Sequence, residues 1–258
     1  MGQRKLFYID SYLEIFCTGM KNKWKSLVYA DLLAGPGISI DPESREEQEG
    51  SALLAIRHSE FVRLFINDIR PEFTQALRDR TGSQASSRIQ VTTMDCNEAV
   101  DLARGFLFPS QNRAETLGLA VIDPTAFQMR YEAIARLTKD LPLDLIIIVM
   151  TGYMRRFVAV DAYANALDGF FGTDDWRRFV EQRKQGFKIT YEALLDLYCD
   201  QLRQLGYQYV SQPHRTQMRN SNRAVIYHMI FASKHKRGAD FSEKITRRTY
   251  SGQRRMLL

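Results

Sequence analysis

The sequence predicts a doubly wound α/β sheet of the Rossmann-like kind, with about seven strands and an antiparallel hairpin at its end. Segments with strand-like and helix-like apolar spacing alternate through roughly five rounds between residues 26 and 150. The segment Leu143–Met150, LDLIIIVM, is almost wholly apolar, as expected for a central parallel strand covered on both faces. With 258 residues, of which 45% are hydrophobic, the chain is long enough to bury a large core.

Residues 1–150 supply an N-terminal helix and most of the sheet. Apolar residues recur at helical spacing in the first segment, and a proline suits the first turn of the third helix. In chain order we expect helix Leu6–Phe16, strand Ser26–Asp31, helix Ser51–Ser59, strand Val62–Asn67, helix Pro71–Arg80, strand Ile89–Thr93, helix Asn97–Phe106, strand Leu117–Ile122, helix Tyr131–Lys139 and strand Leu143–Met150.

The alternation stops after residue 150. Residues 151–189 are rich in aromatic residues and arginines, which predicts a helical insertion above the sheet. Its arginines either follow a phosphate backbone or form an ordinary helix surface, with Phe170 and Trp176 packing it onto the sheet. Residues 190–238 then read as a closing helix, Tyr191–Leu205, and a hairpin of strands Tyr207–Ser211 and Ala224–Ser233 in the same domain.

The net charge of +6 is concentrated at the end of the chain. Residues 234–258 hold eight lysines and arginines against two acidic residues. The basic tail, residues 239–258, is either a phosphate-binding arm or a solvated, frayed end.

Other features exclude several classes of protein. The N-terminus lacks a signal-peptide pattern, and the longest apolar run, Leu145–Met150, is too short to cross a bilayer, so we expect a cytoplasmic protein. Cys17, Cys96 and Cys199 are scattered, no C-x-x-C occurs, and the four histidines are not clustered in the sequence. We therefore expect free thiols and no metal site.

The stretch YADLLAGPGIS, residues 29–39, predicts a ligand loop at a strand end. A strand ends at Asp31, and the loop Ala34, Gly35, Pro36, Gly37 allows a backbone to approach a ligand closely. No lysine follows as in a P-loop, and position 40 is isoleucine where a dinucleotide loop needs glycine. A nucleoside without phosphates remains, S-adenosylmethionine being the commonest on this architecture, and a purely structural turn is the alternative.

Two more acids follow the next two strands. Asp68, before Ile69 and Pro71, is placed to accept both ribose hydroxyls, or only to cap the next helix. Asp95, with the backbone of Cys96 beside it, is placed to accept from an adenine amino group, or again to cap a helix.

A fourth acid ends the central strand Leu117–Ile122. Asp123 precedes Pro124 and is therefore held extended, which suits a carboxylate that orients an amine nucleophile at the cleft. Phe127 is a candidate for stacking on a planar target. The alternative is a turn whose aspartate satisfies backbone donors.

The ordered motifs resemble the three-Cys-motif partner protein family, bacterial proteins with a class I S-adenosylmethionine-dependent methyltransferase fold. The resemblance covers residues 26–238, through YADLLAGPG, GSALLAI, FINDIRPEF, VIDPTAF, the arginine pair of YMRRF (Arg155 and Arg156), FFGTDDW and IFASKHKRG. It implies methyl transfer, with S-adenosylmethionine as cofactor, to a nitrogen of a DNA or RNA base, and a protein partner encoded alongside. In that scheme residues 1–150 contain the cofactor-binding part.

The chain also departs from the family pattern. Leu32 and Leu33 stand where the family has glycine and phenylalanine, and the family's acid at position 67 is Asn67 here, with Asp68 one step later. Thr125 and Ala126 replace phenylalanine and glycine after Asp-Pro. The last change favours two alternatives: a methyltransferase-like binding or regulatory protein without catalysis, or a methyltransferase for a small molecule or protein.

Overall fold

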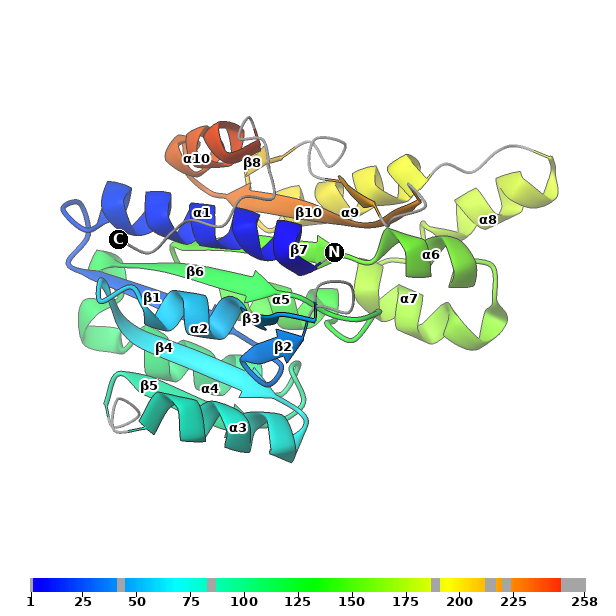
Figure 1. Ribbon diagram of the computed structural model, residues 1–258. Coiled ribbons are helices and arrows are strands. Elements are labelled where there is room, and N and C mark those ends of the chain that lie inside the picture. The colour runs from blue at the N-terminus through cyan, green and yellow to red at the C-terminus, as the bar shows by residue number, and fades with distance from the viewer. Residues whose placement is uncertain are drawn as a thin grey trace.

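The computed structural model of the protein describes residues 2–40, 45–82, 87–186, 191–211, 217–219 and 224–246 (Figure 1). Its main sheet has eight strands, and two other short strands form a separate hairpin. The main sheet contains β1 (Ser26–Asp31), β4 (Phe61–Asp68), β5 (Ile89–Thr93), β6 (Thr116–Ile122), β7 (Leu143–Val149), β8 (Tyr209–Val210), β9 (Gln217–Arg219) and β10 (Val225–Ser233). The separate hairpin pairs β2 (Ile38–Ile40) with β3 (Glu47–Glu49).

The strands of the main sheet lie in the order β5-β4-β1-β6-β7-β10-β8, and β9 pairs with β10. β5, β4, β1, β6 and β7 are parallel, whereas β10 is antiparallel to β7, β8 and β9. Every residue of β6 and β7 is buried, which explains their almost continuous apolar sequence. The predicted doubly wound sheet with an antiparallel end is confirmed.

Helices cover both faces of the sheet (Figure 1). One apolar cluster lies under α1 (Gly2–Met20), α2 (Ser51–Ile56), α3 (Pro71–Thr81) and α10 (Lys236–Thr246). The other lies under α4 (Ala99–Leu107), α5 (Tyr131–Thr138), α7 (Ala164–Phe171) and α9 (Tyr191–Gln204). Neighbouring residues of a strand point to opposite faces, so Phe65 of β4 belongs to the second cluster and Ile66 to the first.

The segment after β7 is helical, as expected. It contains α6 (Thr151–Phe157), a 3₁₀ turn at Asp161–Tyr163, α7 and α8 (Arg177–Lys184). Phe170 and Trp176 are buried in the second cluster, so they pack this segment onto the rest of the protein. The prediction reached to residue 189, and residues 187–189 lie outside the described part of the chain.

Three local elements differ from the expectation. The hairpin β2–β3 is absent from the elements expected from the sequence, and β9 lies within the segment expected to be a loop. The start of the predicted basic tail belongs to α10, because Phe241 and Ile245 are buried against the first cluster. Residues 247–258 lie outside the described part. Among the described helices, none combines the length and the apolar character that a membrane crossing needs.

Candidate active site

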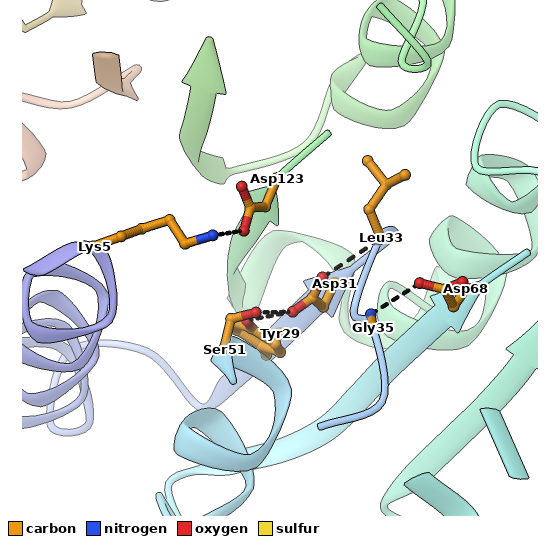
Figure 2. Close-up of polar contacts among 8 residues, drawn as sticks. All are labelled: Lys5, Tyr29, Asp31, Leu33, Gly35, Ser51, Asp68 and Asp123. Atoms are coloured by element: carbon orange, nitrogen blue, oxygen red, sulfur yellow. Dashed lines mark hydrogen bonds and ion pairs between the residues drawn. The ribbon is translucent and has the colours of Figure 1, made fainter. Parts of the chain in front are cut away.

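The four strand-end acids come together at one edge of the sheet. Asp31 and Asp68 are the last residues of β1 and β4, Asp95 follows β5, and Asp123 follows β6. Because β5, β4, β1 and β6 are parallel neighbours, their carboxyl ends form one continuous edge. Figure 2 shows Asp123, Asp31 and Asp68 along this edge, with the loop that carries Gly35 between Asp31 and Asp68.

Asp31 is fully buried at the end of β1. It accepts hydrogen bonds from the hydroxyls of Ser51 (2.5 Å) and Tyr29 (3.2 Å) and from the backbone N–H of Leu33 (3.4 Å). Burial raises the pKa of Asp31 to about 7; the hydrogen bond from Ser51 opposes this rise, and the charge of Asp123 adds to it. No cationic side chain of the described ranges pairs with Asp31, so a cationic ligand near this carboxylate would offset part of the cost of its ionisation.

The glycine loop is tied to Asp68. The N–H of Gly35 donates to Oδ2 of Asp68 (2.9 Å), and the N–H of Arg70 donates to Oδ1 (2.9 Å). The N-cap residue of α3, Arg70, makes no side-chain capping bond, and Asp68 joins the glycine loop to the start of that helix. Gly35 and Gly37 have φ angles of +65° and +82°, which favour glycine, and a Cβ at Gly35 would meet no atom within 4 Å. The loop therefore has open space beside Gly35.

Asn67 joins the ends of three strands, a role that the sequence did not suggest. Its buried side-chain amide donates to the carbonyls of Leu32 (3.1 Å) and Met94 (3.0 Å). Its side-chain oxygen accepts from the N–H of Met94 (3.1 Å) and the hydroxyl of Thr92 (2.8 Å). Its backbone carbonyl accepts from the N–H of Ala34 (2.9 Å). Asn67 thus fixes the loops after β1 and β5 relative to β4.

Asp95 and Cys96 occupy the loop after β5. Oδ1 of Asp95 accepts from the backbone (2.8 Å) and side chain (2.9 Å) of Asn97. The side chain of Asn97 in turn donates to the carbonyl of Gln128 (2.9 Å) and accepts from the N–H of Arg130 (2.8 Å). Cys96 is buried, and burial raises the pKa of its thiol to about 12. Asn97 therefore links this loop to the one that follows Asp123.

Asp123 is paired with a lysine from the N-terminal helix. Nζ of Lys5, near the start of α1, forms an ion pair with Oδ2 of Asp123, and about a fifth of each side chain is exposed. Figure 2 shows Lys5 reaching from α1 to the end of β6. The two residues are 118 positions apart, so no local pattern predicts this pair. In this ion pair Lys5 engages Oδ2 of Asp123.

Phe127 lies in a different environment from the one that stacking on a substrate requires. Only 8% of its side chain is exposed, and Pro124 in the same loop is also buried. The ring of Phe127 packs against Tyr153 and Phe170, with both centroid distances at 5.4 Å. The stacking role expected for Phe127 does not fit this placement, because its ring anchors the loop to α6 and α7.

The arginines of the insertion fall into two groups. Arg155 and Arg156 are exposed on α6, which starts where β7 ends. Arg177 instead donates to Asp168 (2.6 Å) and lies over the ring of Trp176. Between residues 151 and 186, six basic residues are matched by five acidic ones. The exposed arginine pair of α6 lies close to the carboxyl edge of the sheet, because α6 begins directly after β7.

The comparisons with known proteins show the fold. No protein family model matches the chain, and no curated protein does. A Legionella pneumophila protein, LPL1258, described under the family model DUF519, is 14% identical, with a TM-score of 0.53 over 93% of this chain and 90% of that chain. The strand order, with β10 antiparallel between β7 and β8, decides the architecture, and this likeness agrees with it. The chain has the class I methyltransferase fold.

Two further structures are similar over most of this chain. A DUF574 family protein from Streptomyces avermitilis is 11% identical, with a TM-score of 0.48 over 90% of this chain and 82% of that one. Trm1 from Pyrococcus horikoshii, solved with S-adenosyl-L-methionine, is 10% identical, with a TM-score of 0.46 over 91% of this chain and 57% of that one.

Proposed function

We propose that this protein is an S-adenosylmethionine-dependent methyltransferase that modifies an amino nitrogen of a nucleic-acid base. The observation that carries the proposal is the row of strand-end acids and the glycine loop at the carboxyl edge of a class I methyltransferase sheet (Figure 2). Ligands of open α/β sheets bind at this edge.

The residues present fit the cofactor. Asp31, whose pKa is raised by burial, would face the cationic methionine part, and the open space beside Gly35 would admit it. Ala34, Pro36 and Gly37 complete this loop.

The adenosine part would lie further along the edge. Asp68 would accept from the ribose, since each of its oxygens receives a single backbone hydrogen bond within the described contacts. Ile69, which is 61% exposed, would give the adenine an apolar surface. Asp95 and the backbone of Cys96 would contact the adenine amino group.

The cofactor would supply a methyl group that is already electrophilic, so the protein mainly has to position the acceptor and exclude water. Oδ1 of Asp123 would accept a hydrogen bond from the acceptor amine, while Lys5 holds Oδ2. Lys5 is thus a positioning residue for Asp123. Pro124, rigid and buried, would fix the backbone of the same loop.

The exposed arginine pair of α6, Arg155 and Arg156, would contact the phosphates of a DNA or RNA substrate. The basic tail, residues 239–258, would add to the attraction for phosphates. A protein partner encoded alongside remains part of the proposal through the family resemblance.

Calorimetry with S-adenosylmethionine tests the cofactor site. We expect binding by the native protein and a loss of roughly tenfold or more in Asp68→Asn, because a hydrogen bond to a charged group is worth about 1.5–3 kcal/mol. Asp79→Ala, an exposed aspartate of α3, is the matched control and should bind as the native protein does. An unchanged affinity in Asp68→Asn would remove the ribose role, and no binding at all by the native protein would end the proposal.

Transfer of a labelled methyl group to total DNA and RNA tests the chemistry. Asp123→Asn should lower kcat about 100-fold with cofactor affinity unchanged. Lys5→Met should lower kcat less, and Lys5→Arg should restore most of it, since arginine also pairs with a carboxylate. If Asp123→Asn transfers methyl groups at the native rate, Asp123 does not orient the acceptor.

One observation favours a second function, a cofactor-binding regulatory protein without transfer. Lys5 already pairs with the carboxylate that an acceptor amine would use, and Phe127 is packed away from the edge. Cofactor binding without any methyl transfer, in the native protein and in Lys5→Met alike, would support this second function.

A further inference from the structure

Three side chains that can bind a metal lie together away from the row of acids. Cys17 belongs to α1, while His58 and Glu60 lie in the segment that joins α2 to β4. One ligand atom from each lies within 4.8 Å of the other two. Within the described ranges, no other group of three or more histidine, cysteine or acidic side chains meets this distance. The segment precedes β4, so the cluster lies at the amino end of that strand, opposite the carboxyl edge.

The backbone that carries His58 and Glu60 is firmly held. Arg88 donates to the carbonyls of His58 (2.6 Å), Phe61 (2.8 Å) and Ile56 (3.1 Å). The N–H of Phe61 also donates to the carbonyl of His58 (3.2 Å). Cys17 stands on a regular helix and is 1% exposed. The three donors are therefore positioned by rigid elements, as a metal site requires.

The donor set selects the kind of ion. A thiolate, an imidazole and a carboxylate suit Zn²⁺, whereas Mg²⁺ and Ca²⁺ prefer oxygen ligands. Bonds of about 2.0–2.3 Å in a tetrahedral site place donor atoms roughly 3.3–3.8 Å apart, so small side-chain rotations would close the cluster around an ion. Three protein ligands leave a fourth position for water.

The surroundings of Glu60 are compatible with a bound ion. Nζ of Lys21 lies 3.4 Å from Oε1 of Glu60, and 47% of the lysine side chain is exposed, so it can turn into solvent when the ion takes the carboxylate. Glu60 itself is 25% exposed, which gives the ion a route from solvent.

We propose that Cys17, His58 and Glu60 form a three-ligand Zn²⁺ site that fastens α1 to the segment between α2 and β4. The ion would join the N-terminal helix to the start of β4 without entering the cofactor site. It would also stabilise the folded chain, because the three ligands come together only after folding.

Titration of the metal-free, full-length protein with Zn²⁺ and with Co²⁺ tests this site. We expect one ion per chain, and for Co²⁺ a thiolate-to-metal charge-transfer band. Cys17→Ser should lose this band, and Glu60→Gln should bind Zn²⁺ roughly tenfold or more weakly. Cys199→Ser, at another buried cysteine, is the matched control and should keep both the band and the affinity.

Glu60→Gln also separates a loss of Zn²⁺ binding from a loss of folding. Its side chain is partly exposed, so its melting temperature without metal should equal that of the native protein, while the rise in melting temperature on adding Zn²⁺ should shrink. Equal Zn²⁺ affinity in the native protein, Cys17→Ser and Glu60→Gln, or the absence of a charge-transfer band, would overturn the proposal.

Discussion

Replacing Asn67 with alanine should loosen the carboxyl edge of the sheet. The substitution removes four side-chain hydrogen bonds: two donated to the carbonyls of Leu32 and Met94, and two accepted from the N–H of Met94 and the hydroxyl of Thr92. Asn67 is fully buried, so water cannot replace its side chain without entering the core.

The expected cost follows from these partners. A buried polar group left without a hydrogen bond costs about 1–3 kcal/mol. Thr92 and Met94 are partly exposed and can recover some hydration, whereas Leu32 is fully buried. We therefore expect the free energy of unfolding to fall by about 3 kcal/mol. For a chain of this size this corresponds to a drop in melting temperature of roughly 6–12 °C.

Urea unfolding followed by circular dichroism measures the change, with the m-value expected to stay constant. Asn165→Ala, at an exposed asparagine, is the control and should shift the free energy of unfolding by less than about 0.5 kcal/mol. Asn67→Asp keeps the shape but places a carboxylate against two carbonyl oxygens, so it should be more destabilising at pH 8 than at pH 5. A loss below about 1 kcal/mol in Asn67→Ala would refute the reasoning.

Three further predictions concern charge, backbone and salt. Burial raises the pKa values of the Asp31 and Asp144 carboxyls to about 7, so between about pH 4 and 7 the folded state holds protons that the unfolded state has lost. The free energy of unfolding should therefore fall as pH rises through this range. Urea midpoints should fall less steeply with pH in Asp31→Asn than in the native protein, and an equal slope would contradict this prediction. Gly37→Ala should cost about 2 kcal/mol, since φ is +82° and the new methyl would lie 2.8 Å from Leu77. Gly105→Ala, at an exposed position of α4, should be neutral or stabilising in the same unfolding assay. Replacing both exposed arginines of α6 with alanine should reduce the slope of log affinity against log salt for single-stranded nucleic acid by about 1.4, and an unchanged slope would show that they do not contact phosphates.

The sequence predicts the fold well where local patterns decide it. Ser26–Asp31 and Ile89–Thr93 match their strands residue for residue. In Ser26–Asp31 burial is almost continuous, and the sequence of this strand is correspondingly apolar. The short strands β2, β3 and β9 have at most three residues each, too few for a period to appear.

The candidate site is predictable only in part. The acids could be placed because each follows its own strand. The hydrogen-bond and ion-pair partners of these acids could not be predicted, because Lys5 is 118 residues from Asp123 and Ser51 is 20 residues from Asp31. The same holds for Cys17 and His58, which look isolated in the sequence and come together only when α1 packs on the sheet. Side-chain partners of this kind depend on packing, which a single sequence does not show.

Side chains at the end of β4 alternate between the two faces of the sheet, which separates Asn67 from Asp68. Asn67 lies on the same face of the sheet as Phe65, and its side-chain amide donates hydrogen bonds to the loops after β1 and β5. Asp68 lies on the other face with Ile66 and accepts a hydrogen bond from the N–H of Gly35. Positions 67 and 68 are neighbours in the sequence but point to opposite faces of the sheet. An alignment gap that moved Asp68 onto position 67 would therefore superpose side chains that belong to different layers.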